Sequence, residues 1–167
     1  MEIYGKKIIK EYNLINDRKI VFINKEFNEE NIKDIIKEIV KDTINFNDYF
    51  MYIVKKENKE GFFMKWHVDD AQLIKKKVGY KDQIKVSDKY YLHYNKEVPI
   101  YTLIIYESTY NNDFSGGILE FADNIKIKPK KGMYILFNSK EVHRVHKILK
   151  GMRINYLIKF YLIKNKL

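Results

Sequence analysis

The stretch KPKKGMYILFNSKEVHRVHKILKGMRINYLIKFY, residues 128–161, decides the fold class. Its short apolar or alternating runs are separated by turn signals, KPKKG before the first run and LKG before the last. Short runs bounded by Gly, Pro and polar clusters are typical of β-strands. We therefore predict strands at residues 132–137, 142–148 and 152–162.

Similar runs occur upstream, at residues 49–54, 62–68, 99–106 and 117–121. One segment before them, residues 29–41, has helical spacing instead. Asn28 can cap this helix, acidic residues occupy its first turn, and its apolar positions follow a 3.6-residue period. These positions are Ile32, Ile35, Ile36, Ile39 and Val40. Many short strands after one helix predict a mainly β fold, a β-sandwich or jelly roll with the N-terminal helix packed on a sheet.

The length of 167 residues predicts a single domain, residues 1–167, with no repeat or linker to divide it. Residues 70–98 are rich in Lys and Tyr and weakly periodic. We expect them to form a long loop or flap with a short strand or helical turn. Long loops in compact domains are often functional.

The composition narrows the function classes. There is no cysteine, which excludes disulfide scaffolds, thiolate metal sites and cysteine nucleophiles. There is also no apolar run long enough for a membrane span and no signal-peptide pattern at the start. The sequence therefore predicts a cytoplasmic protein without a membrane partner, in which any metal is held by His, Asp or Glu. The formal charge of +10 keeps nucleic acid open as a partner, although the lysines are scattered.

A histidine and an aspartate end a predicted strand in KWHVDDAQ, residues 65–72. Successive side chains of a strand point to opposite sides, so His67 and Asp69 share one face while Trp66 faces the other way. One imidazole and one carboxylate can then reach a single cation. Asp70 is an alternative carboxylate, but the alternation directs it away from His67. Without a metal, the carboxylate of Asp69 is expected to be unpaired, so its removal should cost little stability.

A second histidine precedes an arginine in residues 128–161. If LKG forms a hairpin turn, Val145 pairs with Arg153 and His143 pairs with Asn155. His143 and Arg153 would then share one face. His146 is the alternative histidine, but it lies on the opposite face of its predicted strand.

Two imidazoles and one carboxylate on one face of a metal, with the other positions open, are typical of non-haem Fe(II) oxygenases. The candidate ligands here are His67, Asp69 and His143. Bound Fe(II) would keep a positive charge, so an anionic bidentate co-substrate and then O₂ can complete the shell. Arg153 could bind the far carboxylate of that co-substrate through its planar guanidinium, a task for which lysine is not equivalent.

In their order along the chain, these residues resemble the 2-oxoglutarate and Fe(II)-dependent dioxygenases, particularly the prolyl-hydroxylase-like branch. The resemblance covers residues 62–161. Its shared pattern is His67-Val68-Asp69, SGGILEF at 115–121, KPKKGMYILF at 128–137, His143 and Arg153.

The resemblance implies a double-stranded β-helix with Fe(II) as cofactor and 2-oxoglutarate and O₂ as co-substrates. It implies that His67, Asp69 and His143 bind the iron and that Arg153 binds 2-oxoglutarate. Tyr106 matches a tyrosine whose hydroxyl often assists this arginine, and a buried structural tyrosine is the alternative.

The chain also departs from the prolyl-hydroxylase pattern. Met64 stands three positions before His67, where prolyl hydroxylases often have Tyr, and residues 70–98 are long and unlike theirs. Because that region usually contacts the substrate, proline specificity stays open.

Three functions follow. The first is hydroxylation of a peptide or protein side chain, with 2-oxoglutarate converted to succinate and CO₂. The second is the same chemistry on nucleic acid, in which hydroxylation of an N-methyl group releases formaldehyde; it would need a basic rim and stacking aromatics. The third is a non-catalytic jelly-roll binding module.

Overall fold

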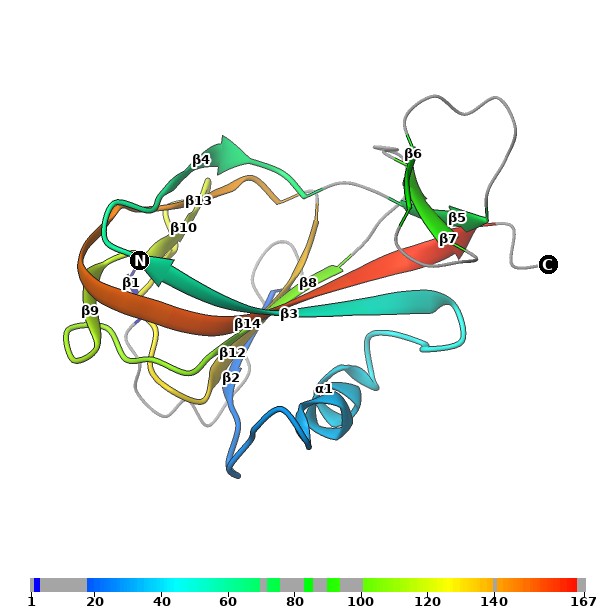
Figure 1. Cartoon of the computed structure of the whole chain (residues 1–167), viewed down its shortest axis with the longest axis horizontal. Coiled ribbons are helices and arrows are strands. Elements are labelled where there is room, and N and C mark those ends of the chain that lie inside the picture. Colours follow the sequence, from blue (N-terminus) through cyan, green and yellow to red (C-terminus); the bar gives the residue numbers. More distant parts are fainter. Residues whose placement is uncertain are drawn as a thin grey trace.

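The computed structural model describes residues 2–3, 18–69, 72–75, 83–85, 90–93, 101–139 and 141–164. These residues form two β-sheets and one helix, α1 (Ile32–Val40) (Figure 1). The smaller sheet, here the minor sheet, has the strand order β1 (Glu2–Ile3), β11 (Lys126–Ile127), β10 (Leu119–Phe121), β13 (His143–Val145) and β4 (Met64–His67).

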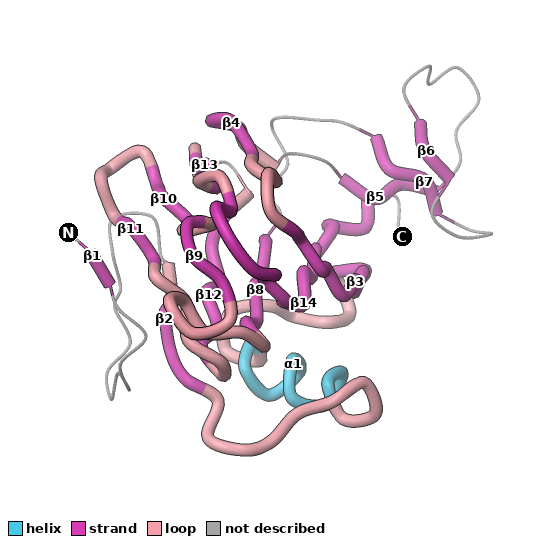
Figure 2. Tube along the Cα trace, turned by 60° about the vertical axis from the view of Figure 1, so that its left-hand side comes forward, coloured by secondary structure: helices cyan, strands magenta, loops and turns pink. Residues whose placement is uncertain are grey.

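The larger sheet, here the major sheet, begins with β2 (Lys19–Phe22), β12 (Met133–Asn138), β8 (Tyr101–Tyr106) and β14 (Ile148–Lys164). It continues from β14 through β5 (Gln72–Lys75), β7 (Tyr90–His93) and β6 (Gln83–Lys85). Two further strands, β3 (Tyr49–Lys59) and β9 (Phe114–Gly116), also pair with β14. Figure 2 shows the two sheets facing each other, with α1 on the outer side of the major sheet. This arrangement confirms the predicted mainly β jelly roll with its helix on the major sheet.

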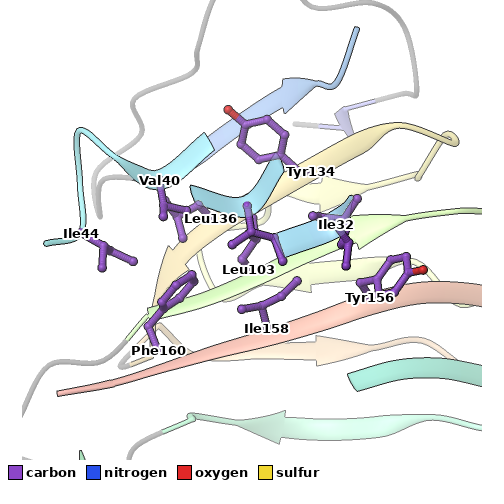
Figure 3. Packing of buried hydrophobic residues seen from close by; sticks show 11 residues of the cluster. Ile32, Val40, Ile44, Leu103, Tyr134, Leu136, Tyr156, Ile158 and Phe160 are labelled. Atoms are coloured by element: carbon purple, nitrogen blue, oxygen red, sulfur yellow. The ribbon is translucent and has the colours of Figure 1, made fainter. Parts of the chain in front are cut away.

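Alternate residues of the central strands face two different hydrophobic clusters. On β12, Met133, Ile135 and Phe137 pack between the two sheets, whereas Tyr134 and Leu136 face the helix. This division follows from the two-residue period of a strand whose two faces are both covered. Figure 3 shows the cluster on the helix side.

The helix α1 is held to the major sheet by the apolar positions that its sequence predicts. Ile32, Ile35, Ile36 and Val40 are buried, and burial of each such side chain contributes about 2 kcal/mol. The helix begins at Ile32 rather than at residue 29. The Oδ1 atom of Asn28 accepts hydrogen bonds from the backbone N–H groups of residues 30 and 31, which form a turn before the helix. No helix of the described residues is long and apolar enough to cross a membrane.

The predicted hairpin between the strands of His143 and Arg153 is wrong. β13 pairs with β10 and β4, whereas β14 pairs with β3, β8, β9 and β5. The backbone N–H of His146 bonds to the carbonyl of Ile118, and the chain then passes into the major sheet at Ile148. The LKG motif therefore lies inside β14, where Gly151 has a φ of 77° opposite β9.

The predicted loop at residues 70–98 also differs from the structure. Its described parts form three short strands, β5, β7 and β6, which pair antiparallel and extend the major sheet beyond the end of β14. The remaining residues of this segment lie outside the described part of the chain.

Candidate metal centre

Two strands of the minor sheet bring two histidines together. His67 of β4 and His143 of β13 are direct partners in the antiparallel register, and their ring centroids lie 4.2 Å apart. The sequence predicted both residues for one site. The structure places them on neighbouring strands of the same sheet.

Backbone carbonyls orient the two imidazole rings. The Nδ1 atom of His67 lies 2.6 Å from the carbonyl oxygen of Lys65, and Nδ1 of His143 lies 2.8 Å from that of Glu141. Because a carbonyl oxygen only accepts hydrogen bonds, we assign the proton of each neutral ring to Nδ1. Each Nε2 atom then keeps a lone pair for a ligand, as in histidines that bind metals.

The carboxylate of Asp69 lies beside both Nε2 atoms. Its Oδ1 atom is 3.6 Å from Nε2 of His67, and its Oδ2 atom is 3.5 Å from Nε2 of His143. The backbone N–H of Asp69 donates to the carbonyl of Ser139, which fixes this residue just after β4. The three ligand atoms lie within 4.8 Å of one another, and this set of two imidazoles and one carboxylate fits a divalent ion such as Fe(II).

A lysine that the sequence analysis missed completes the surroundings of Asp69. The Nζ atom of Lys159, on β14, lies 2.5 Å from Oδ2 of Asp69 and donates a 3.3 Å hydrogen bond to Oγ1 of Thr102. The alternation of β14 places Lys159 on the same face as Arg153, six residues earlier. That parity is the signal that could have found it.

Burial and charge act on these groups in opposite directions. Burial alone would raise the pKa of Asp69, but the ammonium group of Lys159, with smaller contributions from His143 and His67, outweighs this effect and holds the pKa below its ordinary value. Burial also lowers the pKa of Lys159, against the pull of Asp69. Burial lowers the pKa of His143, which favours the neutral imidazole that binds metals.

Arg153 lies in the same cavity as these residues. The cavity has a volume of about 260 Å³ and is lined by residues of both sheets, including the two histidines and Asp69. Arg153 therefore shares the cavity with His143 because the two sheets face each other, and no hairpin is needed. Among the described residues that line the cavity, Asp69 is the only acid.

The guanidinium of Arg153 is buried without a carboxylate partner among the described residues. Its Nη1 atom donates to the carbonyl of Gly117 at 2.9 Å, and the group lies 5.8 Å from the ring centroid of Phe62. Its Nε atom and Oδ1 of Asn155, which also lines the cavity, are buried without a hydrogen-bond partner. Because buried polar groups are normally hydrogen-bonded, this part of the cavity fits an anionic polar ligand.

Gly117 holds its carbonyl toward Arg153 through a backbone conformation that favours glycine. Its φ is 62°, and a Cβ atom there would lie 2.9 Å from Cγ1 of Ile148. The two glycines of SGGILEF thus form a bend between β9 and β10, with no helix after them.

Tyr106 is buried between the two sheets, close to Arg153. Burial raises its pKa to about 12, and the charge of Arg153 acts in the opposite direction. Its hydroxyl therefore stays protonated at neutral pH. Thr102 and Ile104, which share its face of β8, line the cavity.

The alternative histidine, His146, makes its contacts outside this centre. Nε2 of His146 lies 2.7 Å from Oε1 of Glu120, and Arg144 donates two hydrogen bonds to the same oxygen. The guanidinium of Arg144 also lies 4.5 Å from the ring centroid of Trp66. Asp70 lies outside the described residues, and His93 is described only as part of β7.

The comparisons with known proteins agree with this geometry. A family model described as the 2OG-Fe(II) oxygenase superfamily matches residues 49–161, which include every residue of the candidate centre. A comparison with curated proteins found no match.

Two solved structures illustrate the shared fold. A viral collagen prolyl hydroxylase from Paramecium bursaria Chlorella virus-1, solved as a 2OG complex, is 18% identical with a TM-score of 0.56; the match covers 89% of this chain and 81% of that one. An oxidoreductase of the 2OG-Fe(II) oxygenase family from Burkholderia pseudomallei is 11% identical with a TM-score of 0.50, over 86% of this chain and 65% of that one. At such identities the likeness establishes the fold alone.

Proposed function

Because this chain belongs to the 2OG-Fe(II) oxygenase superfamily, we propose that it hydroxylates a side chain of a peptide or protein at the centre formed by His67, Asp69 and His143. The observation that carries the proposal is the convergence of these three ligand atoms within 4.8 Å, in a cavity that also contains a buried arginine. The chain is a 2-oxoglutarate-dependent dioxygenase with Fe(II) as its cofactor and O₂ as the oxidant.

When bound, Fe(II) supplies the redox chemistry by which O₂ converts 2-oxoglutarate to succinate and CO₂ and adds one oxygen atom to the substrate. The role of this chain would be to bind the metal from one side only. Two neutral imidazoles and one carboxylate, all on the wall where β4 ends and β13 begins, would hold the metal and leave the cavity side open for ligands.

Arg153 binds the far carboxylate of 2-oxoglutarate in this proposal. Three features support the assignment: the arginine is buried, it has no carboxylate partner among the described side chains, and its Nε donor is free. A planar guanidinium suits a carboxylate because it can donate two parallel hydrogen bonds. Tyr106, a neutral hydroxyl near this guanidinium, assists in the same role.

A peptide is the substrate class that the surroundings of His67 support best. Exposed apolar side chains flank this histidine along β4 and just beyond it: Phe63, Met64, Trp66 and Val68. Among the described strands, β4 is the last in the minor sheet, so an extended chain could lie along it. The likeness to a collagen prolyl hydroxylase points to the same class.

The test is a succinate-release screen with Fe(II), 2-oxoglutarate and O₂. The candidate substrates are peptides containing proline or lysine, methylated oligonucleotides and free amino acids. The proposal predicts succinate stimulated by at least one peptide, together with a peptide product that is heavier by one oxygen atom. Stimulation by methylated oligonucleotides alone, with formaldehyde release, would instead favour oxidative demethylation of nucleic acid. A His143→Ala protein serves as the control for adventitious iron chemistry.

A further inference from the structure

Lys159 occupies a position that the proposed metal centre does not require. Its side chain is 15% exposed, lines the cavity, and forms an ion pair with Asp69 at 2.5 Å. Its backbone lies opposite Thr102 in the β8–β14 register, and its ammonium group donates to the hydroxyl of that residue. A largely buried lysine thus contacts a proposed metal ligand directly.

The two oxygens of Asp69 have different surroundings. Oδ2 accepts from Lys159 and Thr102, whereas Oδ1 is the oxygen nearer to His67. Lys159 therefore holds the carboxylate in one orientation, with Oδ1 directed toward His67 and Oδ2 beside Nε2 of His143. This ammonium group neutralises Asp69 in the metal-free protein, a role that a divalent ion would otherwise fill.

The charges in the cavity become unbalanced when a divalent ion binds. The ion, Arg153 and Lys159 together carry four positive charges, and the exposed Lys56 adds a fifth. The only negative charge among the described lining residues is that of Asp69. Both histidines are neutral ligands. In a partly buried site such an excess of positive charge is unfavourable, because low-dielectric surroundings screen repulsion poorly. A dianion such as 2-oxoglutarate offsets two of these positive charges.

We propose that Lys159 is a positioning residue that couples metal binding to co-substrate binding, so that the site binds a divalent ion weakly until the dianion enters the cavity. The inference rests on the metal centre proposed above and assigns a regulatory role to one further residue of it. Linkage is reciprocal, so the metal must strengthen the binding of 2-oxoglutarate by the same factor.

The charge of Lys159 can be removed while a hydrogen bond is kept. Lys159→Gln retains an N–H donor for Asp69, Lys159→Met removes both charge and donor, and Lys159→Arg retains the charge. Lys56 provides a matched control. It lines the same cavity from β3, is exposed, and forms no ion pair with Asp69, so Lys56→Met removes one nearby lysine charge without disturbing the carboxylate.

The experiment is a Mn(II) titration of the metal-free full chain, followed by electron paramagnetic resonance of free Mn(II), with and without 2-oxoglutarate. We expect Lys159→Gln to bind Mn(II) alone about ten-fold more tightly than wild type, and to gain correspondingly less affinity when 2-oxoglutarate is added. Lys159→Arg and Lys56→Met should follow the wild-type pattern. Thermal unfolding of each variant verifies that it is folded, and Lys159→Met repeats the charge test if Lys159→Gln is not.

The possible results distinguish failure of the proposed metal centre from failure of the proposed role of Lys159. Wild-type protein that binds no Mn(II) with or without 2-oxoglutarate overturns the metal centre itself. Wild-type protein that binds Mn(II), together with Lys159→Gln binding no more tightly, overturns only the coupling role. Weaker Mn(II) binding by Lys159→Gln would make the lysine a simple structural support and would also overturn the proposal.

Discussion

His67 and His143 face each other across the β4–β13 ladder, with ring centroids 4.2 Å apart and each Nδ1 atom next to a backbone carbonyl oxygen. Asp69 follows β4 directly, so the pairing of β4 with β13 also sets the position of Asp69 relative to both histidines.

The first prediction separates the two histidines of HRVH. We expect His143→Ala to weaken Mn(II) binding by more than about 100-fold, because the loss of a ligand exceeds the effect of losing an outer-shell partner. His146→Ala should bind Mn(II) like wild type, since His146 bonds to Glu120 on the outer side of the minor sheet. Calorimetric titration measures both. Equal losses in the two variants would contradict the assignment.

The second prediction concerns the ion pair at the centre. In metal-free protein, Asp69→Ala leaves the largely buried Lys159 without its carboxylate. We expect a loss of about 2 kcal/mol in the free energy of unfolding, which is less than for a fully buried pair because both side chains are partly exposed. Adding Lys159→Met should restore most of that loss. Urea unfolding of both variants is the measurement, and an Asp69→Ala protein as stable as wild type would show that the pair contributes nothing.

The third prediction addresses co-substrate binding. Arg153→Lys keeps the charge but loses the planar fork and the bond to the carbonyl of Gly117. We expect the KM for 2-oxoglutarate to rise by about ten-fold, with a smaller effect on kcat, because a ground-state contact is lost. Steady-state succinate assays at varied 2-oxoglutarate measure both constants. An unchanged KM would refute this role of Arg153.

The fourth prediction concerns the charge network around the buried Arg18. Arg18 is fully buried, forms ion pairs with Asp123 and Glu141, and its guanidinium lies 4.2 Å from the ring centroid of Phe121. Arg18→Met should therefore destabilise the fold by about 3 kcal/mol, because it removes the buried guanidinium from its ion pair with Glu141.

The matched control for Arg18 is an exposed ion pair. Lys25 and Glu38 are 2.9 Å apart and both are exposed, so solvent screens their attraction. Lys25→Met should leave the midpoint of urea unfolding close to that of wild type. Similar shifts in the two variants would mean that the burial of Arg18 is not what makes it important.

The fifth prediction is a pH dependence of stability. Burial raises the pKa of Glu120, but hydrogen bonds from Arg144 and His146 outweigh it and hold the pKa below the ordinary value of 4.5. Below pH 4.5 the unfolded chain therefore binds more protons at this position, so stability falls as the pH drops from 4.5 through the lowered folded value. Glu120→Gln should reduce this fall and leave the slope above pH 5 unchanged. The measurement is the free energy of unfolding of wild type and Glu120→Gln at several pH values. An equal loss of stability in both proteins below pH 4.5 would contradict the role given to Glu120.

The strand pattern made much of the fold predictable. A continuous apolar run at residues 132–137 and an alternating run at residues 152–162 identified two central strands. The spacing of Ile32, Ile36 and Val40 identified the helix. These signals are strong because both faces of the major sheet are buried, so each side chain has a defined side.

The pairing of strands was not predictable in the same way. A local hairpin explained the common face of His143 and Arg153, but the strands lie in different sheets. From sequence alone, strands that are close in the chain are expected to pair. His143 instead pairs with Phe121 and His67, which are distant in the chain and are brought together by the jelly roll.

The electrostatic surroundings of the centre were also missed. Asp69 was expected to be unpaired, and this is wrong, because Lys159 lies 2.5 Å away. The two residues are far apart in the chain and on facing sheets, so no local pattern links them. The one signal in the sequence was the two-residue alternation of the last strand, which places Lys159 on the same face as Arg153.

The most direct measurement of the central claim is a crystal structure of the protein with Mn(II) and 2-oxoglutarate, with anomalous scattering used to locate the metal. The account predicts one metal peak bonded to Nε2 of His67, Nε2 of His143 and a carboxylate oxygen of Asp69, with the far carboxylate of 2-oxoglutarate on Arg153. A metal bound at His146 and Glu120, or 2-oxoglutarate placed away from Arg153, would contradict it.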